Sequence, residues 1–96
     1  MHAVVRTYSG SGAKDLFGLL EKRKADVEAA MRSVQGLVSY TLVRTGDGGL
    51  LVTVCKDKAG TEASMRVAKE WIQKNAAALG SNPPVVAEGP VFMQIT

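Results

Sequence analysis

The sequence predicts an α+β fold whose elements follow one another in the order β-α-β-β-α-β. Two apolar stripes with helical spacing occupy residues 13–34 and 65–79, and short segments rich in β-branched residues lie before, between and after them. With right-handed crossovers, this order gives a four-stranded antiparallel sheet that carries both helices on one face. The 96 residues fit a single domain, 1–96.

A glycine-rich loop separates the first strand from the first helix. His2–Tyr8 is rich in β-branched and aromatic residues and is followed by Ser9–Gly12, which indicates a strand and then a loop. From Ala13 to about Val34, apolar residues recur at spacings of three, four or seven, so we expect one amphipathic helix that Gly36 ends. Its apolar stripe consists of Leu16, Leu20, Val27, Met31 and Val34.

The middle of the chain predicts a β-hairpin. Gly36–Arg44 and Leu50–Lys56 are β-rich runs, and Thr45–Gly49 joins them. Because hairpin turns need residues with positive φ, we expect the glycines of this connection to supply them.

The last part of the chain predicts a helix and an edge strand. The helix is expected to begin at Asp57 or Thr61 and to continue to about Leu79. The final run, Val85–Ile95, is interrupted by Gly89–Pro90, and because a central strand rarely holds proline, we expect an edge strand with a bulge. The main stripe of the helix is Met65, Ala68, Ile72, Ala76 and Leu79.

Apolar residues occur on both faces of the predicted hairpin. A sheet that is apolar on both faces cannot leave one of them bare in water, and two helices cover only one. We therefore expect a homodimer in which a second copy covers the other face of the sheet across a two-fold axis. The residues concerned are Leu37, Val38, Leu42 and Val43 in one strand and Leu50, Leu51, Val52 and Val54 in the next.

The charge distribution does not favour nucleic-acid binding. The formal net charge is +3, but Lys and Arg are interleaved with Asp and Glu along both predicted helices. The densest basic group, Lys22–Lys24, is bracketed by Glu21 and Asp26. RNA-recognition domains of this topology stack bases on aromatic side chains of the third strand, and Leu50–Lys56 contains none. We expect no nucleic-acid partner.

Other classes of site and location are also disfavoured. The single cysteine, Cys55, cannot form an internal disulfide, and the chain does not open on a secretion signal, so we expect a cytoplasmic protein. No apolar run approaches the roughly 20 residues needed to span a bilayer, so no membrane association is expected. One histidine and one cysteine offer no metal-ligand spacing, and no metal site is expected.

The whole layout resembles the dimeric α+β barrel superfamily, whose members have a ferredoxin-like βαββαβ sandwich. The segments that carry the resemblance are Gly36–Tyr40 continuing through Leu42 to Arg44, the turn through Asp47–Gly48, the apolar third strand, and Trp71 on the second helix. Within the superfamily, the chain is most similar to the small antibiotic-biosynthesis-monooxygenase-like proteins and their uncharacterised relatives.

The resemblance implies a pocket between the helices and the sheet of each subunit. Catalytic members oxidise polycyclic aromatic or quinol-like compounds, often without metal or flavin, so no cofactor is expected. Trp71 resembles the tryptophan of the family's pocket. The haem-degrading branch uses an asparagine on the first strand and a histidine after the second helix. This chain has Arg6–Thr7 on that strand and His2 as its only histidine, so haem degradation is not expected.

Five residues are candidates to line a ligand pocket: Trp71, Tyr8, Tyr40, Arg44 and His2. By strand alternation, Tyr8 shares a sheet face with Arg6, and Tyr40 shares one with Arg44. A phenol beside a guanidinium in a cavity could bind a quinone oxygen or a carboxylate. Trp71 could stack on an aromatic ligand. Plain packing remains the alternative for the tryptophan and for both tyrosines.

His2 has a second possible role. If the first and third strands pair antiparallel, His2 lies near Cys55 or Asp57, and a cysteine within hydrogen-bond reach of a histidine could form a reactive thiolate. The alternative is that Cys55 is an inert core residue, which is the commoner fate of a lone cysteine in an apolar strand.

The sequence leaves two functions open. The first is a cofactor-independent, monooxygenase-like protein that acts on aromatic or quinol-like small molecules. The second is a non-catalytic dimeric module that binds a ligand or a protein. A cavity between helices and sheet would favour the first, and a solid core would favour the second.

Overall fold

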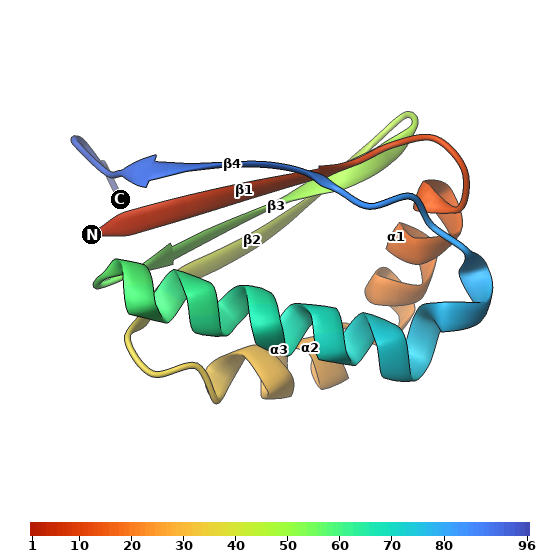
Figure 1. The fold of residues 1–96 in the computed structure, drawn as a ribbon, viewed down its shortest axis with the longest axis horizontal. Helices are drawn as coiled ribbons and strands as arrows, with labels where there is room; N and C mark the ends of the chain where they lie inside the picture. Colours follow the sequence, from red (N-terminus) through yellow and green to blue (C-terminus); the bar gives the residue numbers. More distant parts are fainter.

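Four antiparallel strands form one sheet, and the helices pack against one of its faces (Figure 1). A computed structural model describes all residues, 1–96. The strand order is β2-β3-β1-β4, which confirms the predicted α+β sandwich. The elements are β1 (His2–Tyr8), α1 (Ala13–Lys22), α2 (Lys24–Arg32), β2 (Leu37–Thr45), β3 (Gly48–Cys55), α3 (Lys58–Ala76), a short 3-10 turn η1 (Ala77–Leu79) and β4 (Val85–Pro90).

The first helical segment is two helices, so the prediction of one helix over 13–34 is wrong. Arg23 interrupts it with φ −112° and ψ 32°. The Arg23 N–H still donates to the Leu19 carbonyl at 2.9 Å, so the chain turns without losing that hydrogen bond. The apolar stripe survives the interruption because a seven-residue spacing spans it. Leu16, Leu20, Val27, Met31 and Val34 are all buried.

The hairpin is confirmed, but the predicted role of its glycines is wrong. β2 and β3 pair as far as Thr45 opposite Gly48, and no glycine between them has positive φ. Close packing explains two of these glycines instead. A Cβ at Gly49 would overlap the Phe17 ring, and one at Gly48 would overlap the Tyr8 carbonyl. These two positions let α1 and β1 approach β3 closely.

Helix α3 begins where an aspartate caps it. The Asp57 side chain accepts a hydrogen bond from the Gly60 N–H at 3.0 Å, which satisfies one free donor of the first turn. The residues of α3 that are fully buried are small, so the helix lies close to the sheet. They are Gly60, Thr61, Ser64, Ala68 and Ala76, while Met65, Ile72 and Leu79 of the predicted stripe are half-buried.

Strand β4 is an edge strand as expected, but the predicted bulge is wrong. Its register with β1 has no shift, and the strand ends at Pro90, where the missing N–H stops the ladder. The irregularity of the sheet lies instead in β2, between Leu37 and Ser39. Beyond β4, the Val91 N–H donates to the Met1 carbonyl at 3.0 Å. The tail that follows exposes Phe92, Met93 and Ile95.

The two faces of the sheet differ in cover. One face, the helix face, lies under the helices and buries Val4, Leu51 and Thr53. The other, which we call the outer face, has no helix over it (Figure 1). Three rows of paired residues cross the outer face, and none of them contains a charged side chain. The rows are Ser39–Val54–Ala3–Gly89, Thr41–Val52–Val5–Ala87 and Val43–Leu50–Thr7–Val85.

No helix of the structure combines the length and the hydropathy needed to cross a membrane.

Candidate functional site

A groove of about 740 Å³ lies between the first two helices and β2, and we call it the α1/α2–β2 groove. Its size lies in the range of small-molecule pockets. Phe17, Leu20, Val27, Met31, Leu37 and Leu42 give it apolar walls, and Tyr40 adds a phenol. Charged side chains stand around it, namely Glu21, Lys24, Glu28, Arg32 and Arg44.

Most of the charges at the groove rim are paired with one another. Arg44 Nη1 lies 2.5 Å from Glu21 Oε2, and Arg32 Nη2 lies 2.6 Å from Glu28 Oε2. All four side chains are more than half exposed, so solvent screens these pairs and they stabilise the fold little. Arg44 therefore stands at the mouth of the groove with its charge already balanced.

A second, much smaller cavity of about 10 Å³ lies deeper, and we call it the inner cavity. Arg6, Tyr40 and Trp71 line it together with apolar side chains that include Leu51 and Ile72. Its volume is close to that of one water molecule. Leu20, Val27, Met31 and Tyr40 line both the inner cavity and the groove, so these side chains form the wall between them.

Arg6 is the unexpected residue of this region. It lies on β1 and is only 5% exposed, and its Nη1 donates to the Tyr8 hydroxyl at 3.2 Å. The molecule has four ion pairs, and Arg6 takes part in none of them. The chain thus buries a guanidinium without a carboxylate partner.

Both tyrosines lie beside this cation. Burial raises the pKa of Tyr40 to about 12, against the charge of Arg6, which lowers the pKa. Burial also raises the pKa of Tyr8, again against the charge of Arg6. Both phenols therefore keep their protons at neutral pH, and neither serves as a counterion for the guanidinium.

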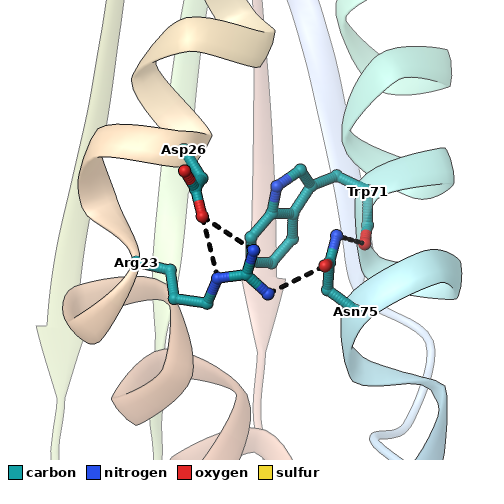
Figure 2. Close-up of polar contacts among 4 residues, drawn as sticks. All are labelled: Arg23, Asp26, Trp71 and Asn75. Carbon is teal, nitrogen blue, oxygen red and sulfur yellow. Dashed lines mark hydrogen bonds and ion pairs between the residues drawn. The ribbon is translucent and has the colours of Figure 1, made fainter.

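Trp71 is half-buried, and a network of residues from the α1–α2 junction, α2 and α3 surrounds it (Figure 2). The Arg23 guanidinium lies over its ring, 5.4 Å from the centroid, within the range of a cation–π contact. Two bonds to Asp26 Oδ2, at 2.7 and 2.9 Å, and one to Asn75 Oδ1, at 2.8 Å, hold that guanidinium. Asn75 Nδ2 in turn donates to the Trp71 carbonyl at 2.9 Å. This network ties the break between α1 and α2 to α3.

His2 lies outside both hollows. It is paired with Cys55 in the sheet register, as expected, but its Nε2 faces Glu88 Oε1 at 3.3 Å. Neither ring nitrogen makes a hydrogen bond. Cys55 is fully buried, and burial, followed by the charge of Asp57, raises the pKa of its thiol. The thiol is therefore protonated at neutral pH, so these contacts do not favour a reactive thiolate.

The structure thus gathers part of the predicted set. Trp71 and Tyr40 meet at the inner cavity, Arg44 stands at the groove rim, and Tyr8 reaches the region through its hydrogen bond to Arg6. The candidate set omitted Arg6 itself. No group of three or more His, Cys, Asp or Glu side chains is placed to hold a metal ion.

Neither a family model nor a curated protein matches the sequence. Among solved structures, a protein of unknown function from Nitrosomonas europaea is similar with a TM-score of 0.72 and 19% identity, over 99% of this chain and 91% of that one. The monooxygenase ActVA-Orf6 of Streptomyces coelicolor, solved with nanaomycin D, is similar with a TM-score of 0.64 and 19% identity, over 99% of this chain and 89% of that one. A dimeric ferredoxin-like protein from an uncultured marine organism is similar with a TM-score of 0.66 and 10% identity, over 99% of this chain and 95% of that one.

These similarities run along nearly the whole chain, and at such low identity they establish the fold. The resemblance to antibiotic-biosynthesis-monooxygenase-like proteins is confirmed at that level: this chain has their ferredoxin-like fold.

Proposed function

We propose that this protein binds a small aromatic molecule of the quinol-like class in the α1/α2–β2 groove and acts on it as a cofactor-independent, monooxygenase-like protein. The observation that carries the proposal is the groove itself, with about 740 Å³ of space, apolar walls and a charged rim. A solid core would have favoured the non-catalytic binding module. The similarly folded ActVA-Orf6, a monooxygenase solved with nanaomycin D, supports the same class of ligand.

Named residues have distinct parts in this proposal. Leu37 and Leu42 of β2, with Val27 and Met31 of α2, contact the apolar rings of the ligand from two sides. Tyr40 offers a hydroxyl from the wall of the groove. Arg44 stands at the entrance, where its contact with Glu21 leaves it a minor role in binding.

The test is a binding and oxidation assay with a panel of naphthohydroquinones. Trp71 is the only tryptophan and lines the inner cavity, so quenching of its fluorescence reports a ligand in the groove next to it. Oxygen uptake with the same panel reports oxidation. We expect saturable quenching by at least one member and oxygen uptake above the uncatalysed rate.

A pair of variants localises the binding site. Leu42→Glu places a carboxylate in the groove wall and is expected to weaken binding about 10-fold or more, because an apolar ligand would then desolvate a charge. Gln73 lies on the exposed side of α3 and does not line the groove, so Gln73→Glu is the control with the same added charge. Equal binding by both variants and the wild type would contradict the groove as the site.

A second candidate function is ligand binding without catalysis. It is favoured by the absence of a histidine from both hollows, since His2 lies elsewhere. Saturable quenching without any oxygen uptake across the panel would support this function over the oxygenase.

We also propose that the active form is a homodimer joined through the outer faces of two sheets. The three rows of the outer face carry no charge, although 22% of the chain is charged. Val43 and Val85 are 43% and 72% exposed in the lone subunit, and such apolar area is usually covered by a partner. The similar dimeric ferredoxin-like proteins support self-association.

A further inference from the structure

The segment after β4, Val91–Thr96, exposes three large apolar side chains, and we call it the tail. Phe92 is 98% exposed, Ile95 86% and Met93 69%. The tail has no charged side chain, and its one backbone hydrogen bond runs from the Val91 N–H to the Met1 carbonyl. Single exposed apolar side chains are common on soluble proteins, but several together on a short uncharged segment indicate a contact surface.

The tail is separated from the groove of its own subunit. It leaves the sheet at Pro90 of the edge strand β4, whereas the α1/α2–β2 groove lies along the opposite edge. Three strand spacings, about 14 Å, lie between the two edges. Helix α3 packs on β1 and β3 in that interval. A partner for the apolar side chains of the tail therefore has to come from another molecule.

The free edge of β2 matches the tail in chemistry. β2 has a neighbouring strand on one side only, so the backbone N–H and C=O groups of its other side have no strand to pair with. Leu37 and Leu42 of β2 wall the groove together with Met31 of α2. An extended uncharged segment can add to such an edge while its side chains enter the apolar hollow beside it.

The proposed contact between two outer faces brings these surfaces together. A two-fold axis that runs between the sheets, parallel to the strands, places β4 of one subunit over β2 of the other, because the two strands occupy opposite edges. Packed sheets are about 10 Å apart. Six extended residues span up to about 20 Å. The tail is therefore long enough to cross from its own sheet to the second one.

The tail would reach one end of the groove first. Leu37 and Pro90 end the same cross-sheet row, Leu37–Cys55–His2–Pro90, and an axis parallel to the strands preserves position along them. β2 begins at Leu37, shortly after α2 ends at Arg32, and both residues line the groove. This end of the groove is therefore the one that lies nearest to the tail of a second copy.

We propose that the tail of each subunit lies along the β2 edge of the other and closes the end of that subunit's groove between Arg32 and Leu37. Phe92 and Ile95 then form part of the groove wall. This inference rests on the proposed homodimer and adds that the groove is incomplete in a lone subunit. An apolar ligand meets side chains from both subunits, so its affinity depends on dimer formation.

The test is a cross-link between two chains that carry one new cysteine each. Gln94→Cys places a thiol in the tail and keeps its apolar side chains, and Arg32→Cys places one at the near end of the groove in the second, tagged chain. The two chains are refolded together and treated with a short bismaleimide. The native Cys55 is fully buried, so it does not compete for the reagent.

A cysteine at the far end of the groove is the matched control. Glu21 also lines the groove, beside Arg44 at the other end of β2. We expect Arg32→Cys to cross-link to Gln94→Cys of the other chain at least about fivefold faster than Glu21→Cys does, because a tether that cannot span two sites gives almost no effective concentration.

A second pair of variants tests the part of the tail in the ligand site. Phe92→Ser combined with Ile95→Ser is expected to keep the dimer in sedimentation equilibrium and to weaken naphthohydroquinone binding about threefold or more, because apolar wall is lost. Val86→Ser is the control, since Val86 is an exposed apolar residue of β4 on the helix face that does not line the groove.

The outcomes separate the tail contact from the dimer and from the ligand. A wild type that sediments as a dimer but cross-links equally to both ends of the groove, or to neither, overturns the tail contact and leaves the dimer standing. A monomeric wild type overturns both. Cross-linking at Arg32→Cys with unchanged ligand binding in the serine variant overturns the role of the tail in the ligand site. If no naphthohydroquinone binds the wild type, the proposed ligand falls, and the cross-link alone decides the tail contact.

Discussion

The two faces of the sheet are built from the same four strands but differ in cover and in charge. The helix face buries Val4, Leu51 and Thr53 under three helices, yet it also holds Arg6 and two tyrosines beside a hollow. The outer face has no charged residue in any of its three rows, and none of its row residues lines the groove or the inner cavity. The buried arginine and the tyrosines thus lie on the face beside the groove and the inner cavity, while the rows of the outer face carry no charge.

This difference indicates that the two faces have different functions. A face of mostly apolar residues, with three hydroxyl side chains and no charge in its rows, is suited to a flat contact with another sheet, where shape and desolvation supply the stabilisation. A buried charge beside a cavity does nothing for such packing and is costly to the subunit. Its presence on the helix face is therefore easier to explain by binding than by folding.

The largest expected effect is on the outer face. Val52→Asp places a carboxylate in the central row, and burying it without a partner in a dimer costs several kcal/mol, so the dissociation constant should rise by about 100-fold or more. Sedimentation equilibrium measures this change. Gln73→Asp, on the exposed side of α3, is the control with the same added charge. A wild type that stays monomeric at high concentration would remove the basis for two differently used faces.

Alkaline pH should reveal the tyrosines of the helix face. The folded pKa of Tyr40 is raised from 10.0 to about 12, mainly by burial. Between these values the folded state holds a proton that the unfolded state has lost, so the stabilisation is complete below about pH 10 and is lost as the pH rises toward 12. We expect the free energy of unfolding to fall by about 2 kcal/mol across this window.

Urea unfolding as a function of pH measures that decline. Tyr40→Phe should flatten the curve, because the variant has no proton to lose at this position. Thr41→Val, the neighbouring outer-face residue, should leave the slope unchanged, since the three rows of that face hold no titratable group. An unchanged slope in Tyr40→Phe would show that the phenol is not held protonated by burial.

The smallest expected effect concerns the free protein without ligand. Arg6→Met replaces an uncompensated buried cation by an apolar side chain and should raise the free energy of unfolding by about 1 kcal/mol. Arg44→Met, at an exposed and paired arginine, should change it by less than about 0.5 kcal/mol. Thermal unfolding compares the two variants. A loss of stability in Arg6→Met would mean that Arg6 stabilises the fold. The charge on the helix face would then need no binding function to explain it.

Periodicity was sufficient to predict the fold but not its irregularities. The order of elements follows from alternation and helical spacing, and it is confirmed. The break between α1 and α2 at Arg23 occurs without a glycine or proline, the residues from which a helix break is usually predicted. There, the side chain's contacts with Asp26, Asn75 and the Trp71 ring accompany a local departure from helical dihedrals. Contacts between segments distant in sequence are invisible to a local pattern.

The candidate site was predictable only in part, because it also depends on contacts between segments that are distant in sequence. Tyr40 and Trp71 are natural candidates by residue type, whereas the sequence indicates Arg6 only as the neighbour of Tyr8 on one face of the sheet. Alternation along β1 contained the stronger signal, because Val4, Arg6 and Tyr8 all point to the helix face. An arginine at such an inward position is rare enough to single out. That no carboxylate would reach it depends on packing, and the sequence alone does not reveal this.

The two ends of the chain meet at one corner of the sheet (Figure 1). The Val91 N–H reaches the Met1 carbonyl at 3.0 Å, so a short peptide could join the ends without crossing either face. New ends could then open at Gly46–Asp47, in the exposed hairpin turn. Such a circularly permuted chain would keep every strand pairing, and it would provide a scaffold whose free ends lie at the hairpin turn.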